Sequence, residues 1–239
     1  MTDNPLQNST ENNLALNIYQ EGISYAVSDE NQQVILRQEL NIPIGTDMDM
    51  HIFEHFFNQP ELQILGENVN ILYESNQYQL IPNELFAEND LKQIFELEHG
   101  ESEKETLLFK ILPKWGANLV FRVPTGILNF FEQKYPDAEI EHTICMLLKK
   151  RIVKSESALW LNLRKGMIDI VVVQNNELLL LTTFQVKTAE DSCYFVLNIY
   201  DQLQLDVESF SLNIISNNAI NEELVLLLKQ YIKQVEVRK

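Results

Sequence analysis

The chain has 239 residues, a net charge of −17, 45% hydrophobic residues and a mean hydropathy of −0.15. This composition is typical of a soluble globular protein with enough apolar side chains for a core. The acidic charge argues against nucleic-acid binding, because an acidic surface repels phosphate backbones, and no uncharged apolar run reaches the ~18 residues of a membrane span.

The N-terminus and the cysteines bear on localisation. Residues 1–13 are polar, lack Lys and Arg and contain no apolar core, so we expect a polar tail and no signal peptide. Cys145 and Cys193 lie far apart and show no metal-binding or redox spacing. We therefore expect two isolated buried thiols in a reducing cytoplasm, and no membrane insertion.

The first part of the chain predicts a three-stranded meander, a helix, a further strand and a second helix. The predicted strands cover residues 14–19, 23–28, 34–42 and 69–73. A turn is expected near Gly22. Thr46 and Asp47 are candidate N-caps for a helix that runs to about Asn58, ahead of Pro60. Residues 82–97 are predicted to be helical.

The middle of the chain predicts two strands, at residues 106–112 and 119–123, separated by Pro113 and Gly116. A helix is expected to begin with Thr125 as its cap and to end before Pro136. A short strand at 138–141 and a helix at 143–152 follow.

The last part repeats the first pattern. The predicted strands cover residues 158–163, 167–173, 178–186 and 210–215, and the predicted helices cover 189–203 and 221–234. Residues 174–177, Gln-Asn-Asn-Glu, are expected to form a hairpin turn. The continuous apolar run at 178–181 favours a strand covered on both faces.

Short stretches recur at a nearly constant spacing. Leu16-Asn17-Ile18, followed by Gly22, recurs as Leu161-Asn162-Leu163, followed by Gly166, at offsets of 145 and 144 residues. Ile71 and Ile214 correspond at an offset of 143 residues. Such a steady offset indicates two copies of one folding unit. We predict two lobes, at residues 14–152 and 153–239, that touch along a cleft.

This order of elements, duplicated, resembles the actin-like ATPase superfamily with its ribonuclease H-like lobes. The stretch from Val123-Pro124-Thr125-Gly126 to Tyr135-Pro136-Asp137 and on to His142 is also similar to the corresponding part of PilM-like pilus-assembly proteins. The whole chain resembles a Bacteroidetes family of unknown function assigned this fold. The resemblance implies an α/β fold in which each lobe has a mixed sheet flanked by helices.

The resemblance also implies where a nucleotide site would lie. In that superfamily ATP binds between the lobes, and two hairpins each offer an Asp for magnesium, followed by Gly and small hydroxyl residues near the phosphates. Here Asn17 and Asn162 stand at the two Asp positions, and bulky side chains fill both turns up to Gly22 and Gly166. A neutral amide is a weaker Mg²⁺ ligand than a carboxylate.

A third element of the superfamily, a glycine pair after a late strand, is also missing. The chain has Ser216-Asn217-Asn218-Ala219 at that place. We therefore predict a degenerate nucleotide site without a bound cofactor. Its vestigial candidate residues are Asn17, Gly22, Asn162, Arg164, Lys165 and Gly166.

Two functions follow from this interpretation. The first is a non-catalytic, protein-binding or scaffolding module with an unidentified protein partner. The alternative is a protein that binds or hydrolyses ATP with Mg²⁺ through substitute ligands, with Lys165 and either Glu21 or Asp169 as the first candidates. The sequence does not determine the oligomeric state.

Two further patterns have both a functional and a structural interpretation. His51-Ile52-Phe53-Glu54-His55 matches the H-x-x-E-H pattern of inverted zinc peptidases. No third ligand can be named, so a solvated helix face is favoured. His142 and Cys145 lie one helical turn apart, but the apolar neighbours of Cys145 favour packing over catalysis.

Overall fold

The computed structural model describes residues 13–45, 47–58, 68–154, 156–216 and 220–238. The chain divides into two units, Met1–Lys150 and Arg151–Lys239. The predicted lobe boundary lies two residues from this division. The predicted polar tail at residues 1–13 falls, except for Asn13, outside the described residues.

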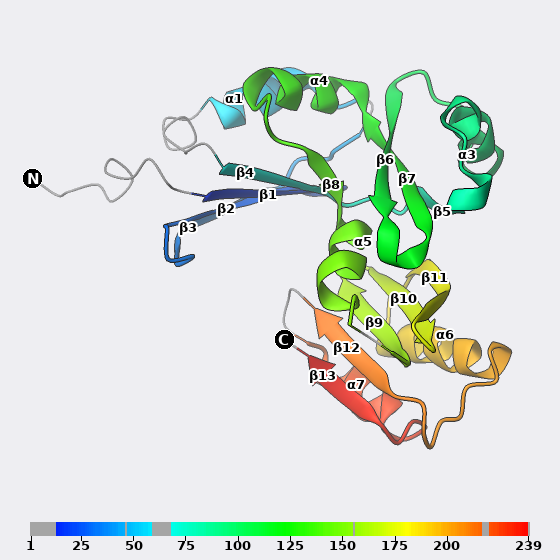
Figure 1. Cartoon of the computed structure of the whole chain (residues 1–239). Helices are drawn as coiled ribbons and strands as arrows, with labels where there is room; N and C mark the ends of the chain where they lie inside the picture. Colours follow the sequence, from blue (N-terminus) through cyan, green and yellow to red (C-terminus); the bar gives the residue numbers. More distant parts are fainter. Residues whose placement is uncertain (1–12, 46, 59–67, 155, 217–219, 239) are drawn as a thin grey trace, which may run out of the picture. The chain divides into compact units, whose positions relative to one another are not determined.

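The first unit contains a five-stranded sheet in the order β3-β2-β1-β4-β8 (Figure 1). Its strands are β1 (Asn13–Tyr19), β2 (Gly22–Ser28), β3 (Val34–Leu40), β4 (Asn68–Tyr73) and β8 (Ile140–His142). The first three are antiparallel, as predicted, and β4 and β8 continue the sheet in parallel with β1. Alternation along β1 buries Leu14, Leu16 and Ile18 and leaves Ala15 and Asn17 exposed.

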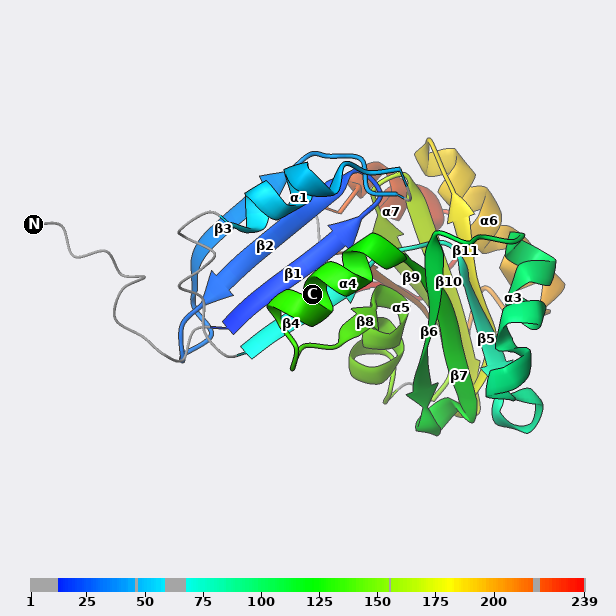
Figure 2. The same ribbon diagram turned by 90° about the horizontal axis from the view of Figure 1, so that it is seen from above.

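Two helices of this unit meet in an aromatic cluster. These helices are α1 (Met50–Phe57) and α4 (Thr125–Lys134), seen close together in Figure 2. The ring centroids of Phe53 and Phe130 lie 4.9 Å apart, and those of Phe57 and Phe131 lie 5.4 Å apart. Such aromatic pairs add about 0.5–1.5 kcal/mol each beyond the burial of their area.

The predicted helix caps need correction. Asp49 caps α1, and its side chain accepts a hydrogen bond from the His51 N–H. The predicted Asp47 lies too far upstream, and the predicted Thr46 lies outside the described residues. In α4 the cap position is Pro124, and the Thr125 hydroxyl instead lies 2.9 Å from that of Thr106.

A second, three-stranded sheet is inserted between β4 and α4 in the order β5-β7-β6. Its elements are β5 (Tyr78–Pro82), α3 (Leu91–His99), β6 (Glu105–Leu112) and β7 (Ala117–Pro124). Ile81, Leu91, Phe95 and Val120 form a small separate core. The prediction of a helix over residues 82–97 was wrong at its start, because Pro82 ends strand β5 and the α-helix begins only at Leu91.

The predicted helix over residues 143–152 consists of two parts. A short α-helix, α5 (Thr143–Met146), continues as a π-helix at Leu147–Arg151. Ile144, Leu147 and Leu148 are buried along this segment.

The second unit has a sheet in the order β11-β10-β9-β12-β13. Its elements are β9 (Ala158–Arg164), β10 (Met167–Gln174), β11 (Glu177–Gln185), α6 (Ala189–Gln202), β12 (Leu212–Ser216), α7 (Glu222–Leu228) and β13 (Val235–Arg238). The helix predicted to reach residue 234 ends at Leu228, and the prediction missed β13, which is too short to show a period.

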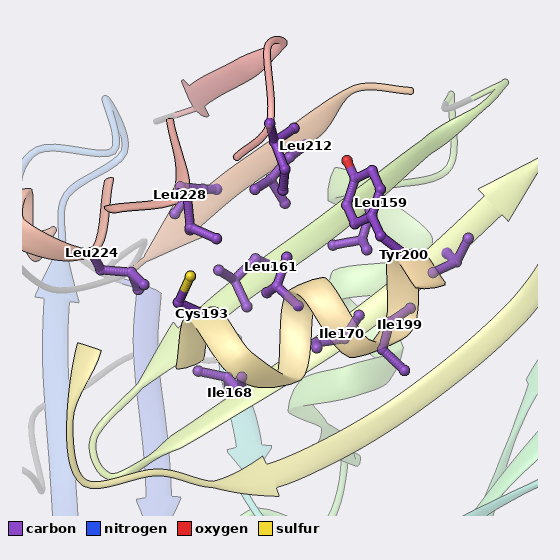
Figure 3. Close-up of a cluster of buried hydrophobic side chains, with 14 of the residues drawn as sticks. Leu159, Leu161, Ile168, Ile170, Cys193, Ile199, Tyr200, Leu212, Leu224 and Leu228 are labelled. Carbon is purple, nitrogen blue, oxygen red and sulfur yellow. The ribbon is translucent and has the colours of Figure 1, made fainter. Parts of the chain in front are cut away.

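The core of the second unit lies between one face of this sheet and α6 and α7. Leu161, Ile170 and Leu212 on the strands meet Cys193 and Leu228 on the helices, as Figure 3 shows. Cys145 and Cys193 are both free and buried, as predicted.

The strand registers confirm the duplication. Leu16 pairs with Ile71 in the first sheet, and Leu161 pairs with Ile214 in the second. These are the positions that the sequence offsets match. The positive φ angles of Asn175 and Asn176 fit the predicted hairpin turn.

Strand β11 differs from its prediction. It is an edge strand in the described part of the chain, and Leu179 is 45% exposed. The run 178–181 is therefore not covered on both faces. None of the described helices combines the length and the apolar composition needed to cross a bilayer.

Candidate functional site

The hairpin of the first unit carries two of the predicted site residues, Asn17 and Gly22. Asn17 is exposed on β1 and pairs across the strands with Ser24, and Glu21 in the turn is also exposed. A Cβ atom added to Gly22 would lie 2.2 Å from the backbone oxygen of Leu40. Gly22 therefore allows the chain after β3 to pass close to the turn, which is a packing role.

The hairpin of the second unit contains a buried polar cluster around Asp169. Asp169 has no exposed surface, and its carboxylate accepts three hydrogen bonds. The donors are Arg164 Nη2 at 2.6 Å, Asn162 Nδ2 at 2.8 Å and Thr183 Oγ1 at 2.7 Å. Two predicted site residues, Asn162 and Arg164, thus converge on one carboxylate.

This cluster determines what Asp169 can do. Its Oδ1 accepts from Arg164 and Thr183, and its Oδ2 accepts from Asn162. The Arg164 side chain is 7% exposed and supplies the opposite charge. A buried carboxylate that is already neutralised and hydrogen-bonded by its own chain is not available as a metal ligand.

The other predicted residues of this unit line a pocket of about 550 Å³. It lies between the turn of the β9–β10 hairpin and the beginnings of α6 and α7. Gly166, with φ of +69°, forms the turn. The lining residues are Leu163, Arg164, Lys165, Gly166, Met167, Ile168, Val186, Lys187, Thr188, Ala189, Glu190, Ser192, Ser216, Asn221, Glu223 and Leu224.

The helix N-termini at this pocket are already capped. The Thr188 side chain accepts from the Asp191 N–H at 3.1 Å, and the Asp191 carboxylate accepts from the N–H groups of Thr188 and Lys187. The Asn221 side chain caps α7 in the same way. These bonds use backbone donors that would otherwise attract an anion.

The charges at the pocket also balance. Lys165 and Lys187 are offset by Glu190 and Glu223, while Arg164 is engaged by Asp169. A triphosphate would meet carboxylates as well as lysines in this pocket.

The residues present do not fit the ATP and magnesium that the fold family implies. The two hairpin positions hold Asn17 and Asn162, and the only acid within the second hairpin's strands, Asp169, is buried in an ion pair. Among the described residues, no group of three His, Cys, Asp or Glu side chains could hold a metal ion.

The zinc-peptidase pattern forms no site within the described residues. His51 and Glu54 lie on the exposed face of α1, with His51 Nδ1 3.6 Å from Glu54 Oε2. The opposite face packs Phe53 and Phe57 into the core, as the structural interpretation predicts.

His142 and Cys145 have structural roles. His142 is fully buried, its Nδ1 accepts from the Ile144 N–H at 3.2 Å, and its Nε2 lies 3.2 Å from the Ser75 oxygen. The ring therefore caps α5 and carries its proton on Nε2. Burial, reinforced by Glu141, raises the pKa of the Cys145 thiol. A nucleophilic cysteine requires the opposite shift.

Sequence reasoning missed Thr183 as part of the cluster and Thr188 as part of the pocket wall. Thr183 pairs with Asp169 only through the β10–β11 register, which no local pattern reveals. Thr188 had a readable signal, since Thr-x-x-Asp before an amphipathic segment is a variant of the capping box.

Solved structures of known proteins have a similar fold. A crystal structure from Bacteroides thetaiotaomicron, described as an actin-like ATPase fold of unknown function, matches with a TM-score of 0.81 and 25% identity, covering 100% of this chain and 94% of that one. The PilM–PilN type IV pilus biogenesis complex matches with a TM-score of 0.54 and 12% identity, covering 95% and 88%.

These structures establish the actin-like ATPase fold that the duplicated pattern predicts. No curated protein matches the chain. A family model described as "Protein of unknown function (DUF3822)" matches residues 2–235. The chain belongs to this DUF3822 family.

Proposed function

We propose that this protein is a non-catalytic member of the actin-like fold that acts as a protein-binding or scaffolding module. The observation that carries the proposal is the state of Asp169. The acid closest to the second nucleotide position is buried and held by Arg164, Asn162 and Thr183. The chain's own guanidinium thus occupies the carboxylate that a metal would need.

The first hairpin supports the same conclusion independently. It offers Asn17 and Ser24 in place of acids, and its glycine is required for the close approach of Leu40. With an amide in place of an acid at both hairpin positions, the magnesium ion that would neutralise a transferring phosphoryl group has no carboxylate ligand there.

A protein partner is the ligand class that remains. A protein with this fold, PilM, is found in a complex with PilN. The likeness at 12% identity concerns the fold, so the partner of this chain is a separate question. We place the module in the cytoplasm, where two free buried cysteines are stable.

Calorimetry with ATP and Mg²⁺ tests the loss of nucleotide binding. We expect no binding heat for the wild-type chain. Micromolar binding that disappears in Gly166→Trp, which fills the pocket mouth, would overturn the proposal. Lys165→Met is the matched variant, since it removes one exposed lysine of the pocket but leaves the turn open.

The competing function, ATP use through substitute ligands, has one observation in its favour. Two positively charged side chains, Lys165 and Lys187, line the pocket at which α6 begins. A phosphate-release assay separates the two functions. Activity that co-purifies with the chain and is lost in Lys165→Ala would support an enzyme, whereas activity that is equal in both chains comes from a contaminant.

A further inference from the structure

Strand β3 forms one edge of the first sheet in the described part of the chain. It pairs with β2 on one side, and Figure 1 shows it at the end of the sheet beyond β2. A bulge between Val27 and Ser28 interrupts the register, so the regular part of β3 is Leu36–Leu40. An edge strand presents backbone N–H and C=O groups that can pair with another strand.

The two faces of β3 differ in chemistry. Leu36, Gln38 and Leu40 stand opposite Val27, Tyr25 and Ile23, the buried residues of β2. Arg37 and Glu39 lie on the other face, opposite Ala26 and Ser24, and both are exposed. The strand therefore has one side with the half-buried Leu36 and Leu40 flanking the exposed Gln38, and a charged side with one residue of each sign.

We propose that two copies of this chain pair antiparallel through their β3 strands, with Gln38 on the two-fold axis. In this register Arg37 of each copy stands opposite Glu39 of the other. Leu36 and Leu40 stand opposite each other on the other side of the strand. The pairing gives two unlike-charge pairs and two leucine pairs from one short strand.

Neighbouring registers are excluded by charge. Both copies use the same edge, so residues that face each other must be an even number of positions apart. Centring the pair on Arg37 places two arginines opposite each other, and centring it on Glu39 places two glutamates opposite each other. Like charges in directly opposed positions are destabilising.

The pairing also closes on itself. A two-fold contact uses the same strand of both copies, so it satisfies each β3 edge and leaves none for a third copy. It would protect an edge that carries Val34, which is 62% exposed, and Ile35, which is 38% exposed.

Sedimentation velocity of the full chain over a concentration series tests the pairing. We expect a monomer of 27.8 kDa at high dilution and a dimer at high concentration. Arg37→Glu alone and Glu39→Arg alone should each weaken dimerisation at least tenfold, because each replaces both unlike-charge pairs by like-charge pairs.

Charge exchange makes the test specific. An equimolar mixture of the two single variants should form mixed dimers, and the double variant Arg37→Glu/Glu39→Arg should dimerise like the wild type. Tyr19→Phe is the control for Glu39, because it removes the hydrogen bond from Tyr19 to Glu39 without altering the edge, and it should remain dimeric.

Three results would overturn the proposal. The first is a wild-type chain that stays monomeric up to its solubility limit. The second is a dimer whose affinity neither single substitution weakens. The third is a pair of single variants that do not associate when mixed. Circular dichroism of every variant confirms that a loss of dimer is not a loss of folding.

Discussion

The hairpins of the two units have corresponding strand positions, but the side chains at these positions differ. Asn17 pairs with Ser24, and Asn162, 145 residues later, pairs with Asp169. The first pair is partly open to solvent, whereas Asp169 is fully buried and bonded to Arg164. The two hairpins thus share a backbone register, but one has a polar surface pair at this position and the other an internal ion pair.

Under the proposed function, the two hairpins would lack a metal ligand for different reasons. The strands β1 and β2 of the first hairpin contain no acid. The second hairpin contains Asp169, but this acid is neutralised from within the same sheet, which stabilises the hairpin only as long as both partners are present. Paired substitutions at matched positions of the two hairpins measure this difference.

The largest expected effect is at the buried ion pair. Asp169→Ala leaves the Arg164 guanidinium buried without its counter-ion and should lower the free energy of unfolding by about 3–5 kcal/mol. Ser24→Ala, the matched change in the first hairpin, should stay within about 0.5 kcal/mol. Urea unfolding measures both. Equal costs would contradict the contrast between the hairpins, and Arg164→Met/Asp169→Leu should recover much of the loss.

The next largest expected effect is a difference in stability cost between substitutions of the two hairpin glycines. Gly22→Ala places a Cβ against the Leu40 backbone oxygen, and overpacking of this kind costs roughly 3 kcal/mol. Gly166→Ala has open space around it but a φ of +69°, which costs about 1 kcal/mol. Thermal and urea unfolding compare them. Gly166→Asn should cost less than Gly166→Ala, because asparagine adopts positive φ more readily.

Replacing each of the two asparagines by aspartate should also affect the stability of the two hairpins differently. Asn162→Asp replaces an N–H donor to Asp169 by a second carboxylate and should cost about 1–3 kcal/mol at neutral pH. The cost should shrink as the pH falls, because protonating one carboxyl of the pair removes the repulsion.

Asn17→Asp is the matched change and should be close to neutral, since Asn17 is exposed. Unfolding curves at several pH values check both variants. A similar pH dependence in the two would show that neither position has a buried charge as its neighbour.

The smallest effect concerns the thiols. Burial raises the pKa of Cys145 and of Cys193, so the thiolate fraction of each is lower at a given pH than in the unfolded chain. A thiol reagent at mildly alkaline pH should label neither cysteine rapidly in the folded chain and both in urea. Rapid labelling of the folded chain would show that a unit opens readily.

The duplicated fold could be predicted from the sequence because its pattern is periodic. Alternation is visible within each strand, and the nearly constant offsets that link Leu16 to Leu161 and Ile71 to Ile214 are visible when the two halves of the chain are compared. The strands β5 and β13 were missed. Each pairs with a single strand, β7 or β12, and depends on that partner for its conformation.

The candidate site was less predictable for a different reason. Asn162 and Arg164 could be named from the resemblance to the actin-like ATPase superfamily, and Asp169 as a candidate substitute ligand. Their bonding depends on the alternation of β9 and β10, which turns all three side chains to one face. Thr183 joins from a third strand. Whether a carboxylate is free or neutralised is decided by such cross-strand neighbours, which lie up to 21 positions apart in this cluster.

The small inserted sheet has an evolutionary consequence. Its core of Ile81, Leu91, Phe95 and Val120 is separate from the aromatic cluster of α1 and α4. Substitutions on the outside of this appendage can therefore accumulate without disturbing the strand registers on which both copies depend. Related chains should vary in length and surface there first, around α3. Strand β7 is buried along its whole length, which makes the exposed residues around α3, and not β7, the natural place to graft or trim when the protein is re-engineered.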